Sequence, residues 1–325
     1  MTLKFVLCAL VVMLFSLYLP AQAQQPAKIT KIGFLGTRPA PASGQRLWRE
    51  LRELGLVEGK NLTIELRYAD NHLDRLPALA EELVRLDIDV LVTPGISETL
   101  AAKNATKTIP IVFYEMGTDP VAIGLIDSFS RPGGNITGFT NVAFVLAGKR
   151  LELLKETISK LSVVAVLWDP QNPGSAQQWK ESQLSARDLG LQLLSVEVSS
   201  ADKLESGIKV AAKTRGTALS VTGSALFNLH QKWIADLTTK NRLPAMYPRT
   251  DFVESGGLMS YGPDETERFR RAAALIDKIL KGRKPAELPV EQPTDFALVI
   301  NLKTAKQIGL TIPPNVLARA DRVLK

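Results

Sequence analysis

Cysteine and histidine are almost absent from this chain of 325 residues. Cys8 is the single cysteine, and His72 and His230 are the two histidines. The histidines lack the spacing of a metal-binding pair, and their polar neighbours indicate surface positions. The sequence therefore gives no support to a zinc enzyme or to a disulfide-stabilised domain.

Sequence motifs of nucleotide and acyl-transfer enzymes are also missing. The chain contains neither G-x-G-x-x-G nor the phosphate loop G-x-x-x-x-G-K-[ST]. Residues 95–99 begin like a nucleophile elbow but lack its second glycine. We expect a protein that is not an enzyme and needs no cofactor. A two-lobed transferase is an alternative, with Glu115 and Asp119 as its acid/base pair.

Charge is spread along the chain rather than concentrated. The 40 Lys and Arg residues outnumber the 33 Asp and Glu residues, which gives a net charge of +7. A basic chain raises the question of nucleic-acid binding, but there is no Lys/Arg tract and no basic cluster with aromatics. We therefore interpret the charges as a solvated surface and predict no nucleic-acid partner.

The N-terminus resembles a secretory signal. Lys4 precedes an apolar run over residues 5–19, and Pro20-Ala-Gln-Ala23 matches a small-residue cleavage site. We predict a signal peptide over 1–23, cleavage after Ala23 and a periplasmic location. Cys8 lies within the apolar run, where a lipoprotein cysteine would not be. A retained membrane anchor is the alternative, but the run is short for one.

Strand and helix patterns alternate twice along the rest of the chain. The first set of predicted strands covers 27–35, 62–68, 89–93 and 111–113, with helices over 45–54, 73–86 and 97–106. The second set of strands covers 162–168, 191–198, 218–221 and 244–247, with helices over 148–160, 176–189, 201–214 and 226–241. Such alternation predicts parallel, doubly wound sheets.

Further short elements follow the second set: helices over 265–281 and 303–308 and a strand over 297–301. They indicate that the chain crosses between two lobes more than once. We predict an α/β fold of two doubly wound lobes joined by a multi-strand hinge. Lobe I would comprise 28–141 plus about 262–290, and lobe II about 142–261 plus 291–325.

Polar and small residues follow the predicted strands of both lobes, where open α/β sheets bind ligands. The candidate ligand-binding residues are Thr37, Arg38, Pro94, Gly95, Ile96, Ser97, Glu115, Asp119, Asn141, Asn172, Thr222, Ser224, Tyr247, Arg249 and Tyr261. Each of them alone also fits an ordinary cap or turn. Their joint placement at strand ends in two lobes favours a binding role.

Two side-chain types among these loops suggest particular contacts. Arg38 and Arg249 are able to bind a carboxylate through two hydrogen bonds each, the alternative being ion pairs with Glu115, Asp119 or Asp251. The aromatic residues near strand ends could stack on a flat ligand: Tyr114, Trp168, Tyr247 and Tyr261. For Trp168 a position in the core is an equally good interpretation.

An ordered set of segments resembles a known family. They are KIGFL at 31–35, GLVEGKNL at 55–62, IPIVF at 109–113, DPVAIGL at 119–125, RPGGNITG at 131–138, GGLMSYG at 256–262, ILKGRKP at 279–285, LPVE at 288–291, VINLKTAK at 299–306, GLTIPP at 309–314 and LARAD at 317–321. Their order and spacing are similar to those of the ABC-transporter substrate-binding family that includes tryptophan- and tyrosine-binding members. The resemblance covers nearly the whole chain after residue 23.

The resemblance implies a type I periplasmic-binding-protein fold, with two lobes, three hinge strands and a solute in the cleft. It also implies that the protein delivers a small solute to a membrane permease driven by a separate ATPase and has no catalytic residues. We expect the protein to be a monomer. The cleft positions it carries over are Thr37, Arg38, Pro94 to Ser97, Glu115, Asp119, Asn172, Thr222, Ser224 and Tyr261. The alternative is a sensory module that presents its closed form to a membrane receptor.

One loop departs from the family pattern. Many members carry an acidic residue, suited to a ligand ammonium group, where this chain has Thr222-Gly-Ser224. Its absence, together with Arg38 and Arg249, favours an organic acid or aromatic carboxylate over an α-amino acid.

Overall fold

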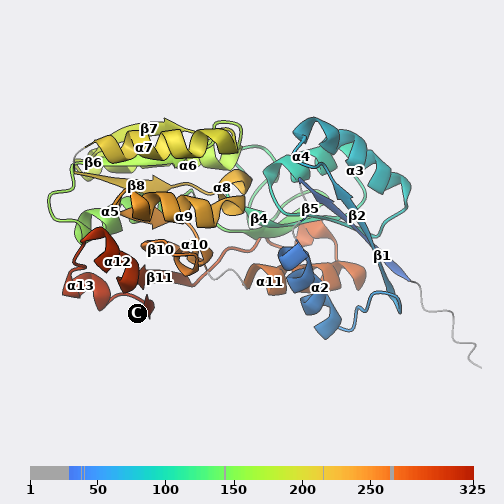
Figure 1. Ribbon diagram of the computed structural model, residues 1–325. Helices are drawn as coiled ribbons and strands as arrows, with labels where there is room; N and C mark the ends of the chain where they lie inside the picture. Colours follow the sequence, from blue (N-terminus) through green and yellow to red (C-terminus); the bar gives the residue numbers. More distant parts are fainter. Residues whose placement is uncertain (1–28, 38, 40, 143, 215, 264–266) are drawn as a thin grey trace, which may run out of the picture.

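The computed structural model describes residues 29–325 apart from 38, 40, 143, 215 and 264–266. Its strands form two separate sheets, each flanked by helices, and the two layered units lie side by side (Figure 1). The predicted signal peptide and Cys8 lie outside the described residues. In the part of the chain that is described, no helix is both long and apolar enough to cross a membrane.

The first sheet has five parallel strands in the order β2-β1-β3-β4-β5. These are β1 (Thr30–Gly36), β2 (Leu62–Tyr68), β3 (Val90–Thr93), β4 (Ile111–Met116) and β5 (Ile136–Thr140). Helices α3 (Leu76–Arg85) and α4 (Ile96–Ala105) pack on one face, whereas α2 (Pro41–Glu53) and α11 (Glu267–Leu280) pack on the other. All four residues of β3 are buried, as expected for a strand covered on both faces. We call this unit lobe I.

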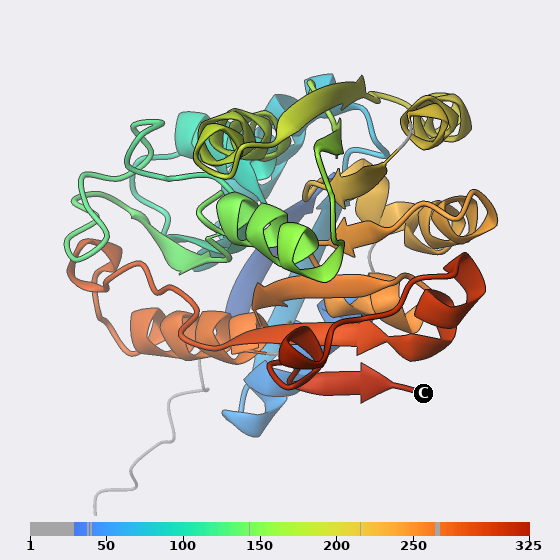
Figure 2. The same ribbon diagram turned by 90° about the vertical axis from the view of Figure 1, so that its left-hand side faces the viewer.

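The second sheet has seven strands in the order β12-β11-β10-β9-β8-β6-β7. They are β6 (Val163–Trp168), β7 (Gln192–Glu197), β8 (Thr217–Val221), β9 (Ala245–Tyr247), β10 (Met259–Pro263), β11 (Phe296–Asn301) and β12 (Arg322–Leu324). Its helices are α5 (Leu146–Thr157), α6 (Pro173–Asp188), α7 (Leu204–Lys213), α8 (Ala225–Leu229), α9 (Gln231–Lys240), α10 (Thr250–Glu254), α12 (Leu302–Ile308) and α13 (Pro314–Leu317). Figure 2 faces this unit, lobe II, and shows helices on both sides of its sheet.

The described elements place three passages of the chain between the lobes. The chain leaves lobe I after β5, returns after β10 to form α11, and leaves again after Glu291. Glu291 bridges to Phe139 of β5 just before the chain reaches β11 in the other sheet. The residue limits predicted above for the two lobes stay a prediction.

Several local predictions differ from the structure. The single helix predicted over 226–241 is two helices, α8 and α9, which meet at His230. Strands β5, β10 and β12 were not among the predicted strands. Strand β10 pairs with β11 antiparallel, unlike every other strand pair of the described residues, because the chain re-enters the sheet from lobe I.

Candidate functional site

A cavity of about 530 Å³ lies between the two lobes. Its walls include residues that follow β1, β3 and β4 of lobe I and residues that follow β6 and β8 of lobe II. Ten of the residues proposed from the sequence line it: Thr37, Pro94, Gly95, Ile96, Ser97, Glu115, Asn141, Asn172, Ser224 and Arg249. The volume is in the range of small-molecule sites.

Asp119 and Thr222, two of the proposed residues, lie outside the cavity lining and bind to the protein itself. The Asp119 carboxylate accepts hydrogen bonds from the backbone N–H of Val121 (2.9 Å) and Ala122 (3.2 Å), so it caps a turn. The buried Thr222 hydroxyl donates to the carbonyl of Leu167 at 3.0 Å. Both side chains hold loops that border the cavity.

Tyr247 and Tyr261 also lie outside the lining. The Tyr247 ring is fully buried in lobe II, stacks on Phe252 with centroids 5.0 Å apart, and shares a 2.7 Å hydrogen bond with Thr238. Tyr261 sits within β10, with its ring 6.1 Å from that of Phe296. Both rings therefore pack within lobe II, and a ligand contact for either of them stays a prediction. Arg38 lies outside the described residues.

Helices α4, α6 and α8 begin at the cavity, and the N–H groups at a helix N-terminus carry partial positive charge. Gly95 precedes α4, Asn172 precedes α6 and Ser224 precedes α8. The Asn172 side chain accepts from Ser175 N–H at 2.9 Å, and the Ser224 hydroxyl accepts from Phe227 N–H at 3.2 Å. These residues are helix caps and cavity residues at once.

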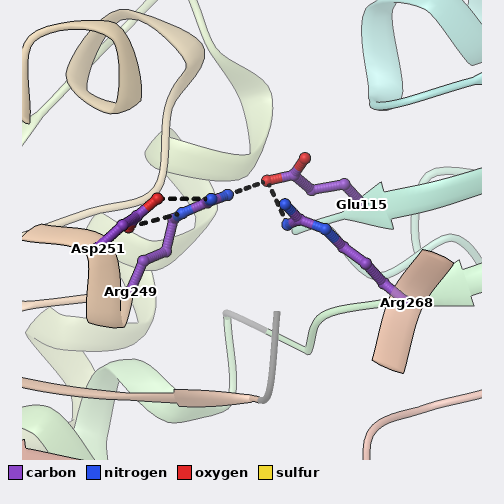
Figure 3. A network of polar contacts seen from close by, with 4 residues as sticks. All are labelled: Glu115, Arg249, Asp251 and Arg268. Carbon is purple, nitrogen blue, oxygen red and sulfur yellow. Dashed lines mark hydrogen bonds and ion pairs between the residues drawn. The ribbon is translucent and has the colours of Figure 1, made fainter. Parts of the chain in front are cut away.

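An ion-pair network joins the lobes at the cavity wall (Figure 3). Glu115 Oε1, at the end of β4, lies 2.7 Å from a guanidinium nitrogen of Arg249 in lobe II and 2.9 Å from one of Arg268 on α11. Arg249 also makes two hydrogen bonds to Asp251, at 3.2 and 2.8 Å. The ion-pair alternative raised for Arg249 is therefore present in the structure.

Glu98, in the first turn of α4, is a cavity residue that the sequence analysis missed. It is 6% exposed, and its Oε1 accepts hydrogen bonds from the Thr37 N–H (3.0 Å) and the Thr37 hydroxyl. Burial raises the pKa of this carboxyl, and the Thr37 hydrogen bonds act in the opposite direction. Only the position of Ser97, one residue earlier, pointed to this part of the helix.

Asp169 faces the cavity from the loop after β6. Its carboxylate accepts a hydrogen bond from Gln171 N–H at 3.0 Å. Burial raises the pKa of Asp169, and hydrogen bonds from the loop and from Ser224 oppose that rise. Asp169 directly follows the strand predicted over 162–168, but Asn172 was the residue of this loop proposed to bind a ligand.

Two other lining residues carried no usable sequence signal. Gln178, on the second turn of α6, is 1% exposed and accepts from Gly223 N–H at 3.0 Å, which ties α6 to the loop after β8. His230, interpreted above as a surface residue, is half-buried at the cavity, with Trp233 edge-on to its ring at 5.9 Å. Their positions depend on how α6, α8 and α9 pack.

Apolar side chains supply the remaining walls. Phe34 and Tyr114, both nearly fully buried, line the cavity from lobe I, and Leu226 and Leu229 line it from lobe II. Burial raises the pKa of the Tyr114 hydroxyl far above its usual range, so the ring stays neutral. The cavity is suited to a molecule with an apolar body and charged or polar groups.

The lobes also touch beside the cavity. Asp119 N–H in lobe I donates to Gln177 Oε1 of α6 at 3.2 Å. Gly174, at the start of α6, lies close to Thr118 of lobe I, and a Cβ added to Gly174 would be 3.0 Å from Thr118 Oγ1. The two lobes are therefore in direct contact beside the cavity.

Two α/β lobes that share a cavity define a solute-binding protein of the periplasmic-binding-protein class, and comparison with known proteins gives the family. Residues 43–324 match the ABC transporter substrate-binding protein family, and the chain belongs to that family. The family consists of substrate-binding proteins rather than enzymes. The predicted fold class and the family resemblance are confirmed.

Individual relatives agree with this assignment. The tyrosine-binding protein of Clostridioides difficile (strain R20291) is 24% identical over 262 residues, which cover 81% of this chain and 75% of that protein. A conserved domain protein from Vibrio cholerae has a TM-score of 0.84 and 28% identity, covering 91% of this chain and all of that one. An ABC domain in complex with L-Trp from Streptococcus pneumoniae has a TM-score of 0.81 and 26% identity, covering 91% of this chain and 99% of that one.

Within the described residues, no group of three or more His, Cys, Asp or Glu side chains is placed to hold a metal ion.

Proposed function

We propose that this chain is the periplasmic solute-binding component of an ABC importer. It would be exported, cleaved after Ala23, and act as a monomer that delivers its solute to a membrane permease with a separate ATPase subunit. The observation that carries this proposal is the cavity between the lobes, which receives residues from strand ends of both. Membership of the substrate-binding family supports the same role.

The solute class we propose is a small organic molecule, either an amino acid or an aromatic or organic carboxylate. Phe34, Tyr114 and Leu226 would contact its apolar body, and the starts of α4 and α6 would face its polar groups. Relatives described as tyrosine-binding and as bound to L-Trp support solutes of this size and character.

The mechanism we propose is closure of the lobes on the solute. A solute that touches both lobes binds the closed form better than the open form and shifts the population toward it. A change from 1:99 to 99:1 requires about 5.5 kcal/mol of differential affinity. The Glu115–Arg249 pair and the contact of α6 with the loop 117–119 form only when the lobes are together, so they add to this preference.

The test is thermal unfolding of the mature chain after unfolding and refolding to remove carried-over ligand. The panel holds aromatic and aliphatic amino acids, aromatic and aliphatic carboxylates, amines, purines and sugars. A solute at a hundred times its Kd adds about 2.7 kcal/mol to the stability, enough to shift Tm by several degrees. A shift confined to one chemical class supports the proposal. Silence across the panel, with a cooperative melt, contradicts it.

A second experiment separates import from sensing. Under the importer proposal, the solute-loaded protein is expected to co-purify with a permease. Co-purification with a membrane receptor and without a permease would contradict the importer role while keeping solute binding.

A further inference from the structure

Glu98 is a buried carboxylate of the cavity wall, and among the described residues its charge has no basic partner. It makes no ion pair with any described Lys, Arg or His, and its hydrogen bonds come from Thr37. The side chain is nevertheless 6% exposed. A carboxylate removed from water without an opposite charge is costly, so such a group either takes up a proton or is paired with a counter-charge. In a binding cavity, a positively charged ligand is able to supply that counter-charge.

Among the described residues, the charged side chains that line the cavity are predominantly acidic. Glu98 and Glu115 line it from lobe I and Asp169 lines it from lobe II, whereas Arg249 is engaged with Glu115 and Asp251. A solute with only negative groups would bring a further like charge toward Glu98. A solute with a positive group would be attracted to it.

We infer that the solute carries a protonated amine and that Glu98 is its binding residue, an inference that rests on the proposed function. The acidic residue thus comes from the first turn of α4 in lobe I, not from the loop 222–224 of lobe II. The sequence of that loop favoured a solute without an amine, and the position of Glu98 reverses this preference.

The surroundings of Glu98 determine how binding depends on pH. Glu115 and Tyr114 of β4 face it within lobe I, and Asp169, His230 and Arg249 line the same cavity from lobe II. Burial and the nearby Glu115 both raise the pKa of Glu98 in the solute-free protein. An ammonium group would keep Glu98 ionised, so amine binding below that raised pKa releases a proton and strengthens as pH rises. A carboxylate-only solute would show the opposite trend.

Sets of matched probes test the inference by titration calorimetry. L-Tryptophan is compared with tryptamine and indole-3-propionate, L-tyrosine with tyramine and 3-(4-hydroxyphenyl)propionate, and L-leucine with isoamylamine and 4-methylpentanoate. Within each set the apolar body is constant while the amine or the carboxylate is missing. The amine-bearing members are expected to bind at least about tenfold more tightly than the acid-only member, since a charge-assisted hydrogen bond contributes about 1.5–3 kcal/mol.

Glu98→Gln isolates the charge, because the amide oxygen still accepts from Thr37 N–H. We expect this variant to lose the preference for the amine. Glu205→Gln is the matched control: it makes the same charge change on the surface of α7, where Glu205 pairs with Lys209, and should keep the preference.

The outcomes separate the two claims. If the acid-only member of a set binds as tightly as its parent, or if Glu98→Gln keeps the amine preference, the inference is overturned and the proposed function stands. If no probe binds and the broader panel is silent, both are overturned. If Glu98→Gln fails to fold, the inference is tested on the wild type. Calorimetry in buffers of different ionisation enthalpy measures whether protons are released when an amine-bearing solute binds. The absence of proton release overturns the inference.

Discussion

Replacing Arg249 with alanine tests whether its ion pair with Glu115 holds the lobes together. The pair spans 2.7 Å, and its side chains are 16% and 23% exposed. When Arg249 is removed, the Glu115 carboxylate keeps its ion pair with the Arg268 guanidinium at 2.9 Å. The Asp251 carboxylate, whose side chain is 31% exposed, is then solvated by water. Breaking a fully buried pair costs about 3–5 kcal/mol and an exposed pair contributes about 0–1, so this partly buried pair, with one partner retained, should contribute about 1–2 kcal/mol.

Because the pair joins two lobes, the loss should fall on the closed form and not on the folding of either lobe. A loss of 1–2 kcal/mol corresponds to a rise in apparent Kd of about 5–30-fold. The rise should be the same for solutes with and without a carboxylate. A direct clamp of Arg249 on the ligand, the role proposed from the sequence, would weaken only the carboxylate-bearing solutes.

Titration calorimetry with a bound parent solute and its decarboxylated counterpart distinguishes these cases, and small-angle X-ray scattering reports closure. Arg322→Ala is the control, since Arg322 pairs with Glu254 at 2.6 Å within lobe II. A double-mutant cycle that combines Arg249→Ala with Glu115→Gln should give a coupling free energy close to the whole effect of Arg249→Ala on binding. An unchanged Kd, or a coupling near zero, would refute the reasoning.

Three other substitutions probe the closed arrangement, the buried acid and the core. Gly174→Ala should weaken solute binding, because the new carbon would lie 3.0 Å from Thr118 Oγ1 across the lobe contact; calorimetry measures it. Without solute, the Glu98→Gln variant should be more stable than the wild type near neutral pH and equally stable in acid. Burial raises the Glu98 pKa above its ordinary value of 4.5, so the wild type loses stability as pH rises through the raised value, which urea unfolding at several pH values would show. Tyr247→Phe should lower the unfolding free energy by about 0.5–1.5 kcal/mol through loss of the Thr238 hydrogen bond and leave affinity unchanged.

Each of these predictions has a clear contrary result. Gly134→Ala is the control for Gly174, since an added Cβ there meets no atom within 4 Å, and equal effects at both positions would remove the lobe-contact explanation. A stability difference between wild type and Glu98→Gln that does not vary with pH would show that burial leaves the carboxyl pKa unshifted. A lower affinity in Tyr247→Phe would return that ring to the binding site.

The sequence was sufficient for the fold class and for many of the residues that line the cavity. Alternation placed a strand at 62–68, the same residues as β2, and the repeated strand–helix order predicted two parallel-type sheets. Since parallel strands end at one edge of their sheet, residues such as Ser97, Asn172 and Ser224 could be predicted from the sequence to lie together, and they line the cavity. Caps and strand ends are local features, and local sequence encodes them.

The partners of the charged groups were beyond the sequence. Glu115 and Arg249 are 134 residues apart and meet only because two lobes face each other across the cavity. Glu98 and Gln178 look like ordinary helix residues, and the packing of α4 and α6 turns both toward the cavity. The chain's repeated crossing between lobes likewise makes β10 and β11 antiparallel neighbours. Local periodicity determined which elements form, whereas long-range packing decided which charged side chains meet and which of them line the cavity.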